Sequence, residues 1–322
     1  METNILNNKW EDVSSFQNHS GYQALRISSN CIPDLFIATD KDGYRCLLLF
    51  LPQEAKIKLK GSNKEKLQLT YISDKNVILI KLNDLDFVDL FNDLIRSLYS
   101  KINSLSESQD YANELIQSFY KWEDFFEDSI SSKLSNEEIQ GLFGELFVLR
   151  NSIREDHLNN VNEILDSWKG PFDHTNDFVY DRKNVEVKTK KDSKSYVKIS
   201  SEFQLEQEFD KGLELMVISV IVDLINGASI FDLLSDIVQL VRENQGDLAI
   251  LYHALNQKRL TIDSVKEYNN HRFIVEKTTS YDCTLNDFPK LSRSNIPEEI
   301  NRVKYNLRIS TLSDFMIEEK KY

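Results

Sequence analysis

The stretch HTNDFVYDRKNVEVKTKK, residues 174–191, limits the fold of this chain more than any other feature. Glu186 and Lys188 alternate with Val185 and Val187, and the side chains of a β-strand point alternately to its two faces. A strand here would therefore present Glu186 and Lys188 on one face and bury the two valines against a core. The alternation predicts a strand that carries a carboxylate and a cation side by side on one face.

A hairpin would bring a second carboxylate to the same face. If residues 181–184, DRKN, form the turn, Asp177 lies opposite Lys188 and diagonal to Glu186. Both carboxylates could then reach one ion, whereas a slip of one residue would separate them. Mg2+ is commonly held by one or two carboxylates together with substrate phosphate, and a nearby lysine can stabilise charge that develops on that phosphate. The alternative is a charged surface hairpin in which Asp177 and Lys188 only pair with each other.

The charge balance of the chain bears on both interpretations. The net charge is -13 over 322 residues, whereas proteins that bind nucleic acids usually carry a basic surface. Residues 181–198 depart from this balance, with seven cations against three carboxylates and a local charge of +4. Such a run is often only a solvated face, but any DNA contact should concentrate there. The lysines expected to make it are Lys183, Lys190, Lys191 and Lys194.

Several classes of protein lack support in the sequence. The longest apolar run, residues 215–225, contains Asp223 and is shorter than the roughly 20 residues that span a bilayer. The first residues, METNILNNKWEDVSS, show no secretory signal, so the cytoplasm is the expected compartment. Cys31, Cys46 and Cys283 have no CxxC spacing and favour neither a disulfide framework nor a zinc site. The motifs of P-loop ATPases, Rossmann dehydrogenases, zincins and α/β-hydrolases are absent.

The hydrophobic patterns divide the chain in two. From Asp84 the apolar residues follow helical spacing, SLSESQ has the composition of a linker, and a further helix is expected at Tyr111–Asp128. We place the boundary at about residue 105, with a β-rich domain and its closing helix at 1–105 and a second domain at 106–322. The first domain is expected to be mostly antiparallel, with five short strands in YQALRIS, DLFIATD, YRCLLLFL, LQLTYIS and NVILIKL.

A helix is predicted from residue 135 onward. Ser135 and Glu138 form a capping-box pattern, and the apolar residues that follow have helical spacing. Glu145 falls at the edge of the apolar stripe, so its carboxylate should either border the core or reach water along its own stem. Gly141, one turn earlier, removes bulk from the same flank and indicates that something approaches closely there.

The second domain is predicted to follow the order α-β-β-β-α-β, which makes the fold class α/β (α+β). The helix is followed by three short strands, DFVY, NVEVK and YVKIS, then by a helix in SEFQLEQEF and a buried strand in LELMVISVIV. An amphipathic helix at 229–244 and two further strands, in HRFIVEKTTSYDC and VKYNLRIS, come next.

Four segments, GLFGEL, SWKGPFDHTNDF, VEVKTK and ISSEFQL, give the chain a resemblance to the PD-(D/E)XK nuclease superfamily. More closely, the chain looks like a bacterial PD-(D/E)XK family found among restriction and phage-defence genes. The resemblance is strongest from about Leu134 to Leu205, and NDFPKL and VKYNLRI extend it toward the C-terminus. It implies a restriction-endonuclease-like core and a nuclease-like domain at 106–322.

The resemblance also implies roles for individual residues. In the superfamily the aspartate and the acidic member of ExK bind magnesium, and these correspond here to Asp177 and Glu186. The motif lysine corresponds to Lys188, and the helical acidic residue that often assists at the metal corresponds to Glu145. Gln204 resembles a position near the substrate, with a solvated helix residue as the alternative.

Three neighbours of these residues carry further expectations. Asn176 stands where the superfamily has proline, which weakens the motif more than the chemistry. His174 could contact phosphate or the shell of the metal, although a loop histidine is more often only polar. Trp168 is expected to anchor the core rather than to stack on a base.

The function expected from the resemblance is a Mg2+-dependent DNA endonuclease, with Mn2+ able to substitute, in restriction or phage defence. A homodimer is expected, because cutting both strands of DNA needs two sites or repositioning and the chain shows one ExK-centred candidate. Methyltransferase or ATPase proteins of a defence system would be its partners, and no membrane is expected. The alternative is a non-catalytic or partner-activated interaction subunit, which the acidic charge balance favours.

Overall fold

The computed structural model describes residues 3–14, 21–55, 57, 59, 61–126, 134–155, 160–172 and 174–322. The chain divides into two compact units, Met1–Asp128 with Asp247–Ala249, and Ser129–Gly246 with Ile250–Tyr322. The boundary expected at about residue 105 falls inside the first unit, between two helices that pack on each other. No helix in the described ranges has the length and apolar character needed to cross a membrane.

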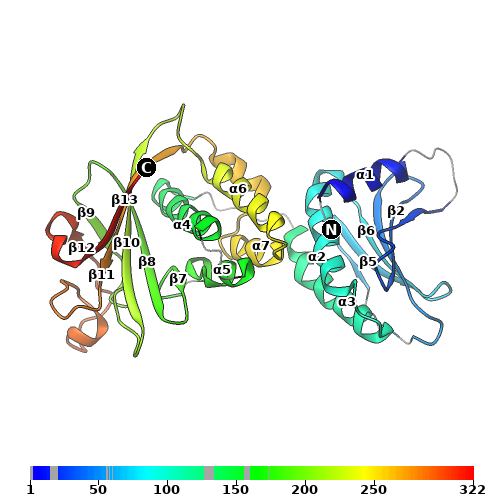
Figure 1. Ribbon diagram of the computed structural model, residues 1–322, viewed down its shortest axis with the longest axis horizontal. Coiled ribbons are helices and arrows are strands. Elements are labelled where there is room, and N and C mark those ends of the chain that lie inside the picture. Colours follow the sequence, from blue (N-terminus) through cyan, green and yellow to red (C-terminus); the bar gives the residue numbers. More distant parts are fainter. Residues whose placement is uncertain are drawn as a thin grey trace. The chain divides into compact units, whose positions relative to one another are not determined.

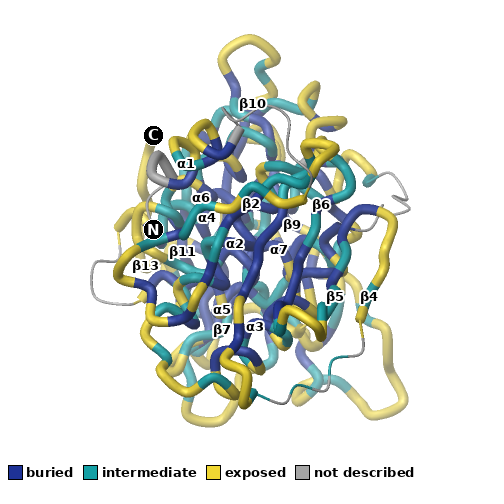
Figure 2. The backbone as a smooth tube through the Cα atoms, turned by 90° about the vertical axis from the view of Figure 1, so that its right-hand side faces the viewer, coloured by how far each residue is buried: buried dark blue, intermediate teal, exposed yellow. Residues whose placement is uncertain are grey.

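The first unit is a six-stranded antiparallel sheet, in the order β1-β2-β3-β6-β5-β4, with helices packed on it (Figure 1). The five predicted strands are all present, and the two predicted helices are α2 and α3, whereas the apolar pattern does not predict α1 or β4. In Figure 2 the central strands are buried and the loops exposed. The elements are α1 (Thr3–Ser14), β1 (Gln23–Arg26), β2 (Asp34–Thr39), β3 (Arg45–Phe50), β4 (Ser62–Asn63), β5 (Leu67–Ile72), β6 (Val77–Leu82), α2 (Val88–Ile102) and α3 (Ser108–Glu123).

The second unit has a five-stranded sheet in the order β13-β11-β10-β8-β7, in which β8 and β10 run parallel and the other pairs antiparallel. Helices α4 and α6 pack together on one side of it, and the two-stranded sheet β9–β12 lies on the other (Figure 1). This mixed architecture confirms the expected fold class, although α5, α7, α8 and β13 were not predicted.

Apart from the helix expected within residues 201–209, the predicted strands and helices of this unit are present, with bounds close to the predicted runs. The strands are β7 (Phe178–Val179), β8 (Lys183–Lys191), β9 (Tyr196–Ile199), β10 (Gly212–Val222), β11 (Phe273–Asp282), β12 (Tyr305–Arg308) and β13 (Met316–Lys321). The helices are α4 (Asn136–Glu155), α5 (Val161–Ser167), α6 (Ile230–Glu243), α7 (Leu248–Gln257) and α8 (Ile262–Val265).

The two faces of the central strands β8 and β10 have different neighbours. Leu215 and Val217 of β10 belong to the buried cluster shared with β9 and β12. In the parallel register, Leu215 lies beside Glu186 and Val217 beside Lys188, so these two polar residues share that face of the sheet. The next residue of the strand, Thr189, points instead to α4. The predicted alternation of faces along this strand is therefore confirmed.

Helix α4 begins at the predicted capping box. Ser135 N donates to Glu138 Oε2 at 2.8 Å, and Glu138 N donates to Ser135 Oγ at 3.3 Å. The glycine that allows close approach to the sheet is Gly144 and not Gly141, so that prediction was wrong by one turn. A Cβ on Gly144 would lie 1.9 Å from Thr189 Oγ1, whereas a Cβ on Gly141 would meet nothing within 4 Å.

Gly144→Ala is expected to lower the free energy of unfolding by about 1–3 kcal/mol, because the added methyl group overpacks the contact between helix and sheet. Gly141→Ala is the matched control in the same helix. Because a Cβ at position 141 meets nothing within 4 Å, this variant should instead raise the free energy of unfolding by about 1 kcal/mol. Alanine has a higher helix propensity than glycine. Urea unfolding measures both values. Equal stability of the two variants would contradict the close packing of α4 on β8.

The segment SEFQLEQEF, residues 201–209, is a series of turns and not the predicted helix. Its polar side chains bind main-chain groups instead. Gln204 Oε1 accepts a hydrogen bond from Ser200 N at 2.8 Å, and the Glu202 carboxylate accepts from the N–H groups of residues 302–303 at 3.1 Å and 3.0 Å. Because residue 302 lies 100 positions further along the chain, local spacing gave no sign of this loop.

Candidate active site

The hairpin of β7 and β8 turns through two residues, 181–182, and not through the predicted four. Tyr180 N donates to Lys183 O at 2.9 Å, and Phe178 pairs with Val185 in the antiparallel register. The shorter turn lets strand β8 begin at Lys183. The register of the whole hairpin is therefore displaced by two residues from the predicted one.

Continuing this register puts Asp177 opposite Glu186, so its predicted position opposite Lys188 was wrong. A displacement of two residues keeps every side chain on its face, because the period of a strand is two. The Asp177 carboxylate is held at the edge of the sheet, where its Oδ2 accepts a hydrogen bond from Val187 N at 2.8 Å. The predicted convergence of Asp177 with the ExK residues thus survives the error in register.

The loop that follows α5 wraps around Asp177. Lys169 N and Gly170 N both donate to Asp177 O, at 2.7 Å and 3.0 Å. A Cβ on Gly170 would lie 2.5 Å from Glu145 Oε2 and 2.9 Å from Asp177 Oδ1. The two carboxylates therefore face the same small space, which the absence of a side chain on Gly170 leaves open.

Glu145 reaches this space from helix α4, and a buried tryptophan holds it there. Trp168 is 1% exposed, as expected of a core residue, and its Nε1 donates to Glu145 Oε2 at 2.8 Å. The ring also lies next to the first strand of the hairpin, through a bridge between Trp168 and Phe178. The tryptophan therefore both anchors the core and orients Glu145, and the second role gave no signal in the sequence.

Glu186 and Lys188 form a buried ion pair. Glu186 Oε1 lies 2.6 Å from Lys188 Nζ, and the two side chains are 1% and 17% exposed. Asn176 is also buried, and its Nδ2 donates to Gln204 O at 2.8 Å and approaches Glu186 Oε2 at 3.5 Å. The asparagine found in place of the usual proline thus ties Glu186 to the 201–209 loop, a bond that proline could not make.

The carboxylates hold their protons more tightly than usual. Burial, and then the charge of Asp177, raises the pKa of Glu186 to about 8 and that of Glu145 to about 8. Burial likewise raises the pKa of Asp177. Keeping these carboxylates charged is therefore costly in the folded chain, and a bound cation or a proton would offset that cost.

Two lysines supply the positive charge. Burial alone would lower the pKa of Lys188, but the charges of Glu186 and Asp177 raise it, so this lysine stays charged. Lys258, just after α7, acts against the effect of burial and lowers the pKa of Glu145 and Asp177. Lys258 is not part of the sequence-based prediction, because it lies far along the chain in no motif.

The remaining candidates lie apart from the carboxylates in their described contacts. The Gln204 side chain binds the main chain of its own loop, and only its carbonyl group touches Asn176. His174 is exposed. In the basic run, Lys183, Lys191 and Lys194 are exposed, whereas Lys190 is buried. Lys183 also pairs with Glu214 at 2.7 Å.

The donor atoms at the site suit a hard divalent cation. Mg2+ and Mn2+ prefer carboxylate oxygen, which Asp177 and Glu186 provide, with Glu145 beside Asp177 as a third carboxylate. Within the described ranges, no group of three or more His, Cys, Asp or Glu side chains is arranged to hold an ion by itself. Mg2+ does not require such a cage, since it keeps several waters and uses one or two carboxylates plus phosphate. The residues therefore fit this metal.

A family model described as "Putative PD-(D/E)XK family member (DUF4420)" matches residues 6–310. The comparisons with curated proteins and with solved structures gave no match. The matched range covers nearly the whole chain and includes the four clustered residues, Glu145, Asp177, Glu186 and Lys188. The chain therefore belongs to this PD-(D/E)XK family.

Proposed function

We propose that the chain is a Mg2+-dependent DNA endonuclease that hydrolyses phosphodiester bonds at this site. The observation that carries the proposal is the convergence of Glu145, Asp177, Glu186 and Lys188 from three separate segments: α4, the residue before β7, and β8. Glu186 is buried and Glu145 and Asp177 are partly buried. Placing three such carboxylates near one another is costly unless a cation or a proton joins them. Such clusters are typical of sites that perform chemistry.

Each residue of the cluster has a separate task in this proposal. Asp177 and Glu186 would hold the metal ion, which when bound would activate water and neutralise charge on the phosphate. Lys188, fixed beside Glu186, would stabilise the negative charge that grows on the phosphate in the transition state. Glu145, oriented by Trp168, would assist as the third carboxylate.

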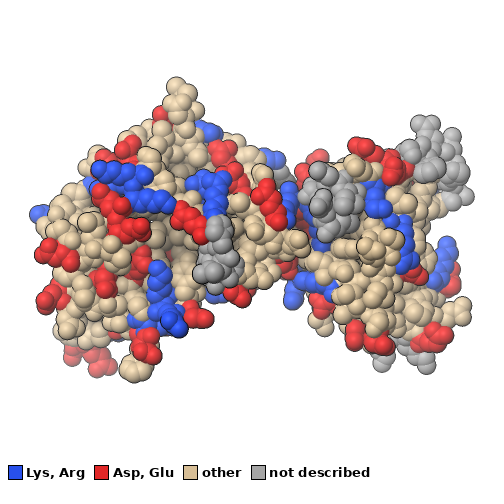
Figure 3. Space-filling model, viewed as in Figure 1, with Lys and Arg blue, Asp and Glu red and all other residues tan. Residues whose placement is uncertain are grey.

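The biological setting that we propose, restriction or phage defence, comes from the family resemblance. The second candidate function is a non-catalytic or partner-activated subunit of a defence complex. Two observations favour it: Lys188 already neutralises Glu186, and the chain has a net charge of -13. Acidic side chains are spread over both units on the face that Figure 3 shows. Autonomous binding to duplex DNA would have to overcome that charge.

Incubating the purified chain with unmodified plasmid DNA separates the two candidates. Cleavage is expected with Mg2+ or Mn2+ and none with a chelator, and Glu186→Gln is expected to be inactive under every condition. A folded chain that cuts neither duplex nor single-stranded DNA with either metal would overturn the autonomous nuclease. Activity that returns only with a methyltransferase or ATPase partner would support the partner-activated subunit.

A further inference from the structure

The two-stranded sheet β9–β12 has one buried face and one exposed face. Its antiparallel register pairs Lys198 with Asn306 and Tyr196 with Arg308, and these four side chains point outward. The two strands lie more than 100 residues apart in the sequence, so neither segment alone reveals the surface that they form. The inward residues, which belong to the buried cluster beneath the sheet, are Val197, Ile199 and Leu307.

The exposed face is strongly basic for a chain with a net charge of -13. Residues 193–201 and 303–313, which form this sheet and its ends, contain no aspartate or glutamate. Tyr196 stands among the cations with 41% of its surface exposed. The cations, all of them exposed, are Lys194, Lys198, Lys304 and Arg308.

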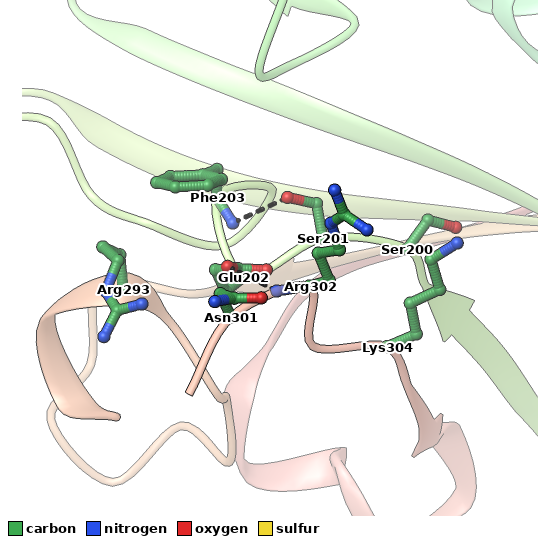
Figure 4. Close-up of a pocket in the computed structure, with 8 residues that line it drawn as sticks. All are labelled: Ser200, Ser201, Glu202, Phe203, Arg293, Asn301, Arg302 and Lys304. Atoms are coloured by element: carbon green, nitrogen blue, oxygen red, sulfur yellow. Dashed lines mark hydrogen bonds between the residues drawn. The ribbon is translucent and has the colours of Figure 1, made fainter. Parts of the chain in front are cut away.

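A pocket of about 580 Å3 opens at one end of this sheet (Figure 4). Arg302 and Lys304 line it from the side of β12. The carboxylate of Glu202, also in the lining, is 3% exposed and accepts hydrogen bonds from main-chain N–H groups, including that of Arg302. Phe203 completes the rim and is 47% exposed. The pocket therefore offers cations and an open aromatic ring, with its carboxylate turned to the main chain.

The loop that lines this pocket also contacts the candidate active site. Gln204 O accepts a hydrogen bond from Asn176 Nδ2 at 2.8 Å, and the same nitrogen lies 3.5 Å from Glu186 Oε2. Asn176 directly precedes Asp177 in the chain. One buried side chain therefore connects the basic face with the carboxylate cluster.

We propose that this basic face, from Arg308 through Lys198 and Lys304 to Phe203, binds a single-stranded segment of nucleic acid and leads it to the carboxylates. The inference rests on the proposed function only in taking the strand to be the substrate. Cations in a row can follow the phosphates, and exposed rings such as Phe203 and Tyr196 can stack on unpaired bases. This combination is how proteins bind single strands, whereas the bases of a duplex are stacked on each other and do not reach such rings.

Binding is tested on the full chain in a chelator, so that metal-dependent cleavage cannot interfere. The probe is a labelled oligothymidylate, followed by fluorescence anisotropy over a range of salt concentrations. Replacing the three cations by alanine should weaken binding about tenfold or more and reduce the salt slope by about 2, since each contact with a single strand contributes about 0.7. This triple variant combines Lys198→Ala, Lys304→Ala and Arg308→Ala in one chain.

The matched control makes the same change of charge in the first unit and should keep both affinity and salt slope. It consists of three exposed lysines: Lys41→Ala, Lys75→Ala and Lys121→Ala. A second variant tests stacking. Phe203→Ala should weaken binding of oligothymidylate about fivefold or more and leave binding of an abasic oligomer unchanged, because only bases stack on the ring.

Unchanged affinity in the triple variant, or an equal loss in the control, would overturn the proposal. A loss confined to duplex DNA would overturn its single-strand part. These results are independent of the proposed function. If the triple variant binds and cuts as before, the proposed nuclease function is retained and the proposed binding surface is rejected. If the face binds the single strand but the chain cuts no DNA with Mg2+, the binding surface is supported and the proposed nuclease function is rejected.

Discussion

Glu186→Gln and Asp177→Asn are each expected to lower Mg2+-dependent DNA cleavage by at least about a hundredfold, because each removes a charged oxygen ligand without changing the shape of the side chain. Neither change should unfold the chain. Burial raises the pKa of both carboxyls, so removing either charge relieves a cost in the folded chain. The cleavage rate is measured on plasmid DNA, and circular dichroism confirms the fold of each variant.

Asp181→Asn is the matched control for these variants. Asp181 lies in the same hairpin but in its exposed turn. The Asp181→Asn variant should therefore cut DNA at the wild-type rate. Cleavage at that rate by folded Glu186→Gln or Asp177→Asn would remove the residue concerned from the proposed metal site. Loss of cleavage in the control as well would indicate that the hairpin tolerates no change, and the assignment would then need a test by metal binding.

Without divalent metal, Glu145→Gln is expected to stabilise the chain by about 2–4 kcal/mol near pH 9 and to have little effect near pH 4. Burial, and then the charge of Asp177, raises the pKa of Glu145 from 4.5 to about 8 in the folded chain. A raised pKa means that the contribution of this group to stability is complete below about pH 4.5 and is lost as the pH rises through about 8. Glutamine avoids that loss and can still accept the hydrogen bond from Trp168.

Urea unfolding of both proteins at several pH values, with a chelator present, measures this difference. Adding Mg2+ near pH 9 should then stabilise the wild type more than the variant, because the cation offsets the charge that the variant lacks. A variant that is less stable than the wild type at every pH would show that the Glu145 charge carries no cost in the folded chain. The packing of Glu145 against Trp168 would then be its main role.

The faces of the strands and the residue types of the site followed from the sequence. Alternation with a period of two put Glu186 and Lys188 on one face, and the capping box at Ser135 set the start of α4. These features depend on neighbours within a few residues, so local sequence was sufficient. The family resemblance added the link between the hairpin and Glu145, which no spacing rule connects.

The register of the hairpin did not follow from the sequence. Turns of two and of four residues around Arg182 both keep Asp177 on the same face as Glu186, so the hydrophobic pattern could not choose between them. The hydrogen bond from Tyr180 N to Lys183 O closes the two-residue turn and so sets the register. An error of two residues was therefore invisible in the pattern and harmless to the site.

Local periodicity and short motifs were enough to predict most of the strands, the first helix of the second unit, and Asp177, Glu186 and Lys188 of the site, while the family resemblance added Glu145. The tertiary structure alone decided that Gly144 meets the sheet, that Trp168 and Asn176 orient the carboxylates, and that residues 201–209 form a loop. Each of these depends on contacts between segments tens to about a hundred residues apart. Such contacts are set by how helices and strands pack, and packing leaves no regular spacing along the chain.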